Sequence, residues 1–142
     1  MKKIIYTLCF ILAASVAEAA IIIINISAIQ PIAGQLSMAL DTQHTYDKDN
    51  KSDSFFTARK TVSADTQQMI IKDVSPGRYA ISIFHDANDN SVLDSNLFGV
   101  PTEAYGFSNN IVGHFGKPNF EQTSFVVGSG QQTVVLDVRL IR

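Results

Sequence analysis

Short runs of alternating apolar residues, broken by glycine, proline, asparagine and aspartate, most constrain the fold of this chain. Alternation with a period of two puts every second side chain on one face of a strand, and the breaking residues mark turns. The clearest run, residues 78–85, has Tyr79, Ile81 and Ile83 on one face and largely apolar residues on the other. This pattern predicts a central strand that is buried on both faces. Six further runs predict strands, at residues 21–28, 35–41, 55–63, 67–74, 123–127 and 131–141.

These runs, with few convincing helix patterns between them, predict the fold class. About seven short strands in one domain indicate an all-β protein, a single β-sandwich of the immunoglobulin-like or prealbumin-like kind. The last two strands are expected to form a hairpin through Gly128-Ser129-Gly130. The polar stretch at residues 41–54 predicts a solvated loop.

The N-terminus has the layout of a secretory signal peptide. Two lysines precede a short apolar run, and the small-residue cleavage site 17–19 follows. An uncleaved membrane anchor is the alternative, but it would place Glu18 inside the bilayer. We therefore expect a signal peptide at residues 1–19 and a single domain at 20–142. The mature form is expected to have no membrane span and to be periplasmic or secreted.

Charge and cysteine content exclude several classes of function. The formal net charge is −2, so the chain has no basic field to hold nucleic acid. The one cysteine, Cys9, lies within the predicted signal peptide, which leaves the mature domain without a disulfide or a thiolate. The sequence also has no nucleophile elbow, zinc-protease motif or phosphate-binding glycine loop.

One loop carries oxygen side chains at the spacing of a calcium-binding loop. Calcium takes six to eight oxygen ligands from a chain that wraps around it, with side chains at alternating positions and one backbone carbonyl. The predicted ligands of Ca²⁺ are Asp86, Asn88, Asn90, Val92 (through its carbonyl), Asp94 and Glu103. Ser91 stands where such loops have glycine. The alternative is an Asx-rich turn, in which the same side chains bond their own backbone without an ion.

A segment of aromatic and amide side chains follows this loop. Such residues could line a groove for a sugar or a peptide, and the partner would be an envelope protein or a glycan. The candidate ligand- or partner-binding residues are Tyr105, Phe107, Asn109 and Asn110. Alternatively, Phe98, Tyr105 and Phe107 fold back as a lid over an open end of the core.

The histidines offer a second kind of site. The fold could gather His85 and His114 with Asp86 into a zinc-dependent or histidine-dependent hydrolase. Against this, alternation places His85 on the same face as Ile81 and Ile83. That placement favours a hydrogen-bonded histidine at the edge of the core.

Five motifs that follow one another along the chain resemble those of a known family. They lie at residues 75–80, 83–94, 99–103, 105–110 and 116–121. In this order they are similar to family 2141 of the domains of unknown function, small exported bacterial proteins. The resemblance implies a signal peptide, one β-domain and a periplasmic or secreted location, and it implies no activity. The family usually has glycine in place of Ser91, which argues against tight ion binding.

The strand and turn pattern is also similar, more weakly, to transthyretin-like and Cna B-type sandwich modules, which are usually binding or structural domains. The function predicted from the sequence is therefore that of an exported, non-enzymatic binding or structural β-module with a calcium loop. The alternative is an unrecognised metal- or histidine-dependent hydrolase.

Overall fold

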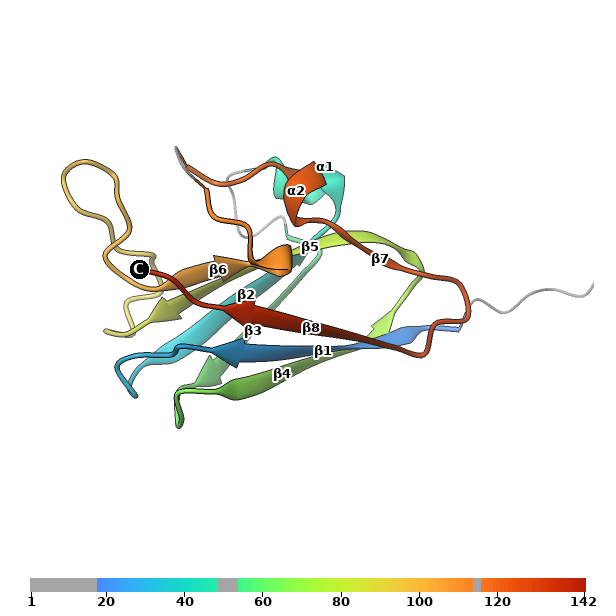
Figure 1. Ribbon diagram of the computed structural model, residues 1–142, viewed down its shortest axis with the longest axis horizontal. Coiled ribbons are helices and arrows are strands. Elements are labelled where there is room, and N and C mark those ends of the chain that lie inside the picture. The colour runs from blue at the N-terminus through green and yellow to red at the C-terminus, as the bar shows by residue number, and fades with distance from the viewer. Residues whose placement is uncertain (1–17, 49–53, 114–115) are drawn as a thin grey trace, which may run out of the picture.

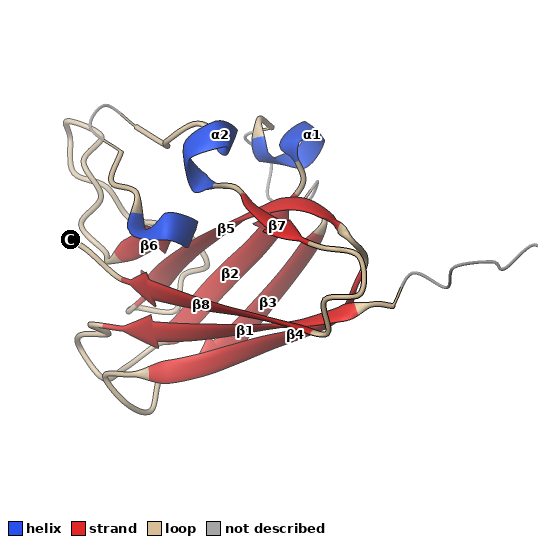
Figure 2. Cartoon of the chain, turned by 45° about the vertical axis from the view of Figure 1, so that its right-hand side comes forward, coloured by secondary structure: helices blue, strands red, loops and turns tan. Residues whose placement is uncertain are grey.

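The computed structural model describes residues 18–48, 54–113 and 116–142, and it has two β-sheets packed face to face (Figures 1 and 2). The β-sandwich predicted from the sequence is therefore confirmed. Most of the predicted signal peptide lies outside the described residues. Within the described part of the chain, no helix is both long enough and apolar enough to cross a membrane.

The smaller sheet has three strands in the order β4-β1-β8. Its central strand, β1 (Ala20–Ser27), pairs antiparallel with β4 (Gln67–Val74) and parallel with β8 (Thr133–Arg139). The first and the last strands of the domain are thus hydrogen-bonded neighbours. This pairing joins strands that are far apart in the sequence within the three-stranded sheet.

The larger sheet has five strands, with β3-β2-β5-β6 in order and β7 on the same long strand β5. They are β2 (Gln35–Asp41), β3 (Phe56–Thr61), β5 (Gly77–Asp86), β6 (Tyr105–Phe107) and β7 (Phe125–Val127). β5 has neighbours on both sides, as its two apolar faces predict.

Alternate side chains of both sheets fill the space between them. Ile22, Ile24 and Ile26 of β1 face Leu36 and Leu40 of β2 across the core, and all five are fully buried. Since alternation puts the intervening residues on the opposite faces, each sheet also has an outer face. The outer face of the five-stranded sheet carries the site described below.

The predicted hairpin between the last two strands is wrong. β7 pairs with Gly77–Tyr79 of β5, and β8 pairs with β1 in the other sheet. In these places Phe125 contacts Tyr79, with 6.5 Å between the ring centroids, and Val134 and Val138 enter the core. Non-local burial of these side chains therefore outweighs the local turn tendency of the Gly-Ser-Gly sequence.

The predicted solvated loop at residues 41–54 is also only partly correct. It carries a short helix, α1 (Gln43–Tyr46), whose Tyr46 is buried. Tyr46 meets Phe120 of a second short helix, α2 (Phe120–Thr123), edge to face with 5.7 Å between centroids. Both rings pack on Ala80 of β5, so the two helices lie together on one part of the outer sheet face (Figure 1).

Candidate functional site

The outer face of the five-stranded sheet is hollowed into a groove of about 780 Å³. Its floor comes from β2, β3 and β5. One wall is the connection between β5 and β6, residues 87–104, which we call the arm and which projects beyond the sheets (Figure 1). The opposite end is bounded by Lys48 and by Lys117.

Strand register explains the shape of the floor. Ala39 of β2 lies opposite Thr57 of β3 and Ser82 of β5, and Ser82 lies opposite Phe107 of β6. One row across the sheet therefore runs from small side chains in the middle to an aromatic ring at the edge. In the next row Ser37 of β2 lies opposite Phe84 of β5, and Phe84 lies opposite Tyr105. Small residues leave room above the centre of the sheet, and the aromatic residues form a wall beside it.

Two polar atoms on this floor have no hydrogen-bond partner among residues 18–48, 54–113 and 116–142. They are Oδ1 of Asp41, a residue that is only 3% exposed, and Oγ of Ser82. Leaving a buried polar group unpaired costs about 1–3 kcal/mol, and nearly all such groups in folded proteins are paired. Both residues line the groove, so a molecule bound there would contact groups that lack partners in the described part of the chain.

A buried tyrosine lies at the lysine end of the groove. The Tyr46 hydroxyl donates to the Pro118 carbonyl at 2.9 Å, and Lys117 Nζ lies 3.6 Å from the Tyr46 ring centroid. Burial raises the pKa of the Tyr46 phenol, and the nearby carboxylates of Asp41 and Asp47 raise this pKa further, against an opposing hydrogen bond with Thr123. The phenol therefore remains a neutral donor.

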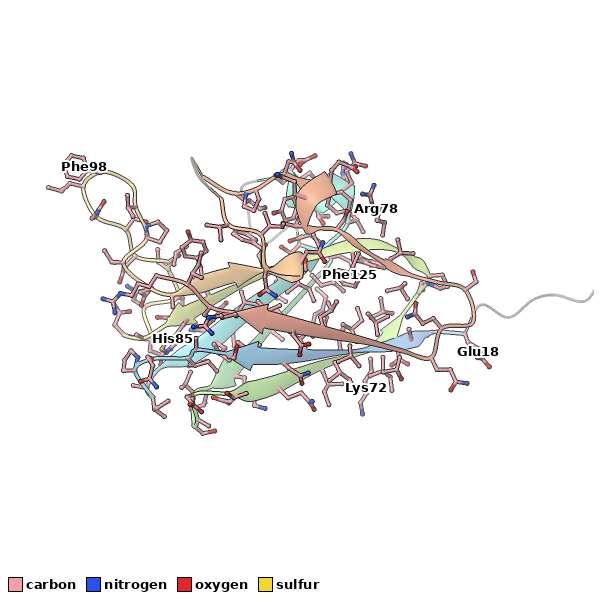
Figure 3. All side chains as sticks on the ribbon, viewed as in Figure 1. Glu18, Lys72, Arg78, His85, Phe98 and Phe125 are labelled. Atoms are coloured by element: carbon pink, nitrogen blue, oxygen red, sulfur yellow. The ribbon has the colours of Figure 1, made fainter. Side chains whose placement is uncertain are left out.

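The tip of the arm is a tight turn that presents apolar side chains to solvent. Asn96 Oδ1 accepts hydrogen bonds from the backbone N–H groups of Phe98, at 2.9 Å, and Val100, at 3.1 Å. Leu97 is fully exposed and Phe98 is 91% exposed. Figure 3 shows Phe98 at the far end of the arm, away from both sheets. The alternative of a lid over the core is therefore wrong for Phe98, which instead lines the rim of the groove.

The four residues predicted to bind a ligand or partner fall into two pairs. Tyr105 and Phe107 line the groove together, with 5.9 Å between their ring centroids. Asn109 Nδ2 donates to the carbonyls of Gln122 and Ser124. Asn110 is bonded to the backbone of β8 through both its amide nitrogen and its amide oxygen. The two asparagine side chains thus attach the end of β6 to α2 and β8.

The loop that begins at Asp86 has the hydrogen bonds of an Asx-rich turn. The fully buried Asp86 carboxylate accepts from the backbone N–H groups of Asn90 and Ser91, at 2.9 and 2.8 Å. It also accepts from Arg59 Nη2 at 2.7 Å. Ser91 has a φ of 68°, the left-handed conformation that glycine adopts most easily. Asn90 Oδ1 accepts from the Val92 N–H at 2.8 Å, which is the Asx-turn geometry.

The six predicted calcium ligands are gathered only in part. The amides of Asn88 and Asn90 both donate to the Asp94 carboxylate, at 2.7–3.1 Å. Glu103 is buried and accepts from two backbone N–H groups of the same loop. Asp86 is instead bonded to Arg59 on the sheet face. Among the described residues, no group of three or more His, Cys, Asp or Glu side chains could hold a metal ion. The turn is confirmed, and calcium binding stays a prediction.

His85 is a core histidine, as alternation indicates. It is 1% exposed, and its Nε2 donates to the Ala33 carbonyl at 2.7 Å. Figure 3 shows it at the end of the sheets, far from the tip of the arm. His114 lies outside the described residues. The structure around His85 therefore does not favour the hydrolase alternative.

Reasoning from the sequence missed the two floor residues with unpaired atoms. Asp41 is the last residue of one predicted strand and the first of the predicted polar loop, and Ser82 is a polar residue within a largely apolar strand. A weak signal was present. Ser37, Ala39 and Asp41 alternate with large core residues in β2, and small side chains on the outer face of an inner strand indicate a hollow.

Comparison with protein families gave one match. A family model described as "Uncharacterized protein conserved in bacteria (DUF2141)" matches residues 24–135. No functionally curated protein and no solved structure matches the chain. The weaker likeness to transthyretin-like and Cna B-type modules therefore stays a prediction.

Proposed function

Because the chain belongs to the DUF2141 family, whose description names no activity, we propose its function from the geometry of the groove. The protein is a non-enzymatic binding module that holds a ligand between the outer face of the five-stranded sheet and the arm. The observation that carries this proposal is the pair of unpaired polar atoms, Asp41 Oδ1 and Ser82 Oγ, on the groove floor. A ligand bound in the groove would supply hydrogen-bond partners to both atoms.

The composition of the walls supports the proposal. Ligand sites combine apolar and aromatic surface with a few polar groups that fix the orientation of the ligand. Here the apolar part comes from Phe107, Tyr105 and the exposed Phe98 of the arm. The polar part is the floor. A volume of about 780 Å³ lies within the range of small-ligand pockets.

The proposed location is the cell envelope, in the periplasm or outside the cell. It rests on the signal-peptide layout of residues 1–19 and on the resemblance to exported proteins. The partner in this proposal is an envelope protein or a glycan. A calcium ion in the loop that begins at Asp86 would hold the base of the arm, and it has no other role in the proposal.

A capture experiment tests the function. The protein produced from the full coding sequence is immobilised and exposed to soluble envelope extracts, and bound material is identified by mass spectrometry. Phe107→Ala should abolish capture because it removes half of the aromatic wall. Val135→Ala, at an exposed site on the other sheet, is the matched control and should capture normally.

Folding of both variants is checked by thermal melting before capture is compared. The proposal is wrong if no material is bound by the wild-type protein, or if a folded Phe107→Ala variant binds as much as the wild type. If the Val135→Ala variant loses capture to the same extent, the binding surface does not lie in the groove.

A further inference from the structure

We infer that the groove binds a neutral, polyhydroxylated ring, the chemistry of a sugar residue. This inference rests on the proposed function and deepens it by naming the class of ligand. The ring would lie with its apolar face on the aromatic wall and its hydroxyl groups toward the floor. Five observations carry the inference: the kind of polar groups, their unpaired atoms, the charges in the groove, the aromatic wall, and the position of the groove on the sheet.

Hydroxyl groups dominate the polar lining. They belong to Ser37, Ser54, Thr57, Ser82, Ser95 and Tyr105. A hydroxyl both donates and accepts, so a set of them matches a ligand whose own groups also do both. Sugars present such groups in a ring, at fixed angles to one another. The lining thus matches a polyol better than a ligand with acceptors alone.

One unpaired atom needs a hydrogen-bond donor on the ligand, and the other can pair with either a donor or an acceptor. A carboxylate oxygen accepts hydrogen bonds, so Asp41 Oδ1 needs a donor, whereas Ser82 Oγ can donate or accept. Asp41 lies opposite Ala80 and Ser82 lies two residues further along β5, on the same face. Such diagonal neighbours have Cβ atoms about 7 Å apart, so both side chains can reach one six-membered ring.

The groove carries charges of both signs, so a ligand with a single charge would meet a like charge as well as an opposite one. A ligand anion near the floor would meet the buried carboxylate of Asp41. A ligand cation would meet the ammonium groups of Lys48 and Lys117 at the end of the groove. Like charges brought together in a partly buried site repel, and binding must also remove water from them. A neutral ligand avoids both costs.

The aromatic wall provides a surface for a flat apolar face. Tyr105 and Phe107 lie beside the floor, and Phe98 offers an exposed ring from the arm. The face of an aromatic ring carries partial negative charge, which suits the slightly positive C–H groups on one side of a sugar ring. Stacking of this kind leaves the hydroxyl groups on the ring edge free to reach Asp41 and Ser82.

A peptide strand is a poorer occupant. A peptide that binds by strand addition needs the free backbone groups of a sheet edge. Except for Thr57 of the edge strand β3, the floor residues lie on β2 and β5, which have strands on both sides and so use their backbone groups within the sheet. Toward a ligand, these two strands therefore present their side chains and not free backbone groups.

The experiment is an NMR titration of ¹⁵N-labelled protein produced from the full coding sequence. The probes are the methyl glycosides of glucose, galactose, mannose and N-acetylglucosamine, with glucosamine and galacturonate as charged comparisons. At least one neutral glycoside should shift the amide signals of Ser82, Tyr105 and Phe107 in a saturable manner. The charged probes should shift them less.

Two substitutions test the floor. Asp41→Asn replaces a carboxylate acceptor with a weaker amide acceptor, and Ser82→Ala removes a hydrogen bond, so each should weaken binding of the neutral glycoside about tenfold. Asp65→Asn and Ser63→Ala are matched controls in the exposed connection between β3 and β4, and they should bind as the wild type does. Spectral dispersion reports whether each variant is folded. If Asp41→Asn does not fold, the smaller change Ser82→Ala carries the test.

The outcomes separate this inference from the proposed function. If no neutral glycoside shifts the groove signals while the envelope capture succeeds through Phe107, the groove binds a ligand of another class and the sugar inference is wrong. If a glycoside binds but both floor variants bind it equally well, the assignment of Asp41 and Ser82 is wrong. If neither glycosides nor envelope extracts bind, both proposals fail.

Discussion

Replacing Ser82 with alanine should make the ligand-free protein more stable. The substitution removes one oxygen atom, which is buried and has no hydrogen-bond partner among the residues that the structure describes. The burial of an unsatisfied polar group costs about 1–3 kcal/mol. The Cβ atom remains in place and the backbone pairing with Ala39 and Phe107 is unchanged, so little of this gain is lost again. We expect a gain of about 1 kcal/mol in the free energy of unfolding.

For a domain of this size, a gain of about 1 kcal/mol raises the melting temperature by about 2–4 °C. Calorimetric melting of the wild type and of Ser82→Ala measures the shift directly. Ser63→Ala, at an exposed serine, is the control and should change stability by less than about 0.5 kcal/mol. A drop in melting temperature of Ser82→Ala would show that the hydroxyl has a partner in the free protein. That result would contradict the conclusion that Ser82 Oγ is unpaired, on which the proposed ligand site depends.

Three further predictions concern the surroundings of the groove. Arg59→Ala should destabilise the protein by about 2 kcal/mol in urea unfolding, since it removes the cation bonded to the buried Asp86; a loss below about 0.5 kcal/mol would contradict this. The pKa of Tyr46 is raised in the folded protein, so above the ordinary pKa of 10.0 the unfolded chain loses the phenol proton before the folded protein does. The free energy of unfolding should therefore fall as pH rises beyond 10.0. Tyr46→Phe should reduce that fall in urea unfolding at several pH values, and an equal fall in the variant would rule out Tyr46. If the loop binds calcium, the ion at ten times its dissociation constant should add about 1.4 kcal/mol, a shift of roughly 3–6 °C over EDTA that Asp94→Ala abolishes; identical melting with EDTA and calcium would end the calcium prediction.

The sequence predicted the strands well because alternation is a local property. In β5, apolar residues on both faces predicted a central position, and the strand does have neighbours on each side. The face of His85 was predicted by the same rule. β6 was not predicted because it has only three residues, with Gly106 in the middle, and so shows no alternation of apolar and polar side chains. Helix α2 carried a signal that was overlooked, the capping pair Asn119 and Gln122.

The groove could not be predicted from the sequence for a different reason. Asp41 and Ser82 lie far apart in the chain and meet only through the register of β2 and β5. Whether a polar atom has a partner depends on every element around it, so no local pattern reports it. The loop that begins at Asp86 is the opposite case. Its spacing was visible in the sequence, but the bond between Asp86 and Arg59 of β3 depends on the sheet.

The parallel pairing of β1 with β8 has a mechanical consequence. Seven residue pairs, from Ile21 with Thr133 to Ser27 with Arg139, join the two strands. Because the strands run in the same direction, the chain enters β1 at one end of this ladder and leaves β8 at the other (Figure 1). Tension on the chain at the two sides of the domain would therefore load the rungs in shear, all at once, instead of opening them one by one. Rupture then requires the whole ladder to slide, so the domain should resist stretching along this axis more strongly than across it.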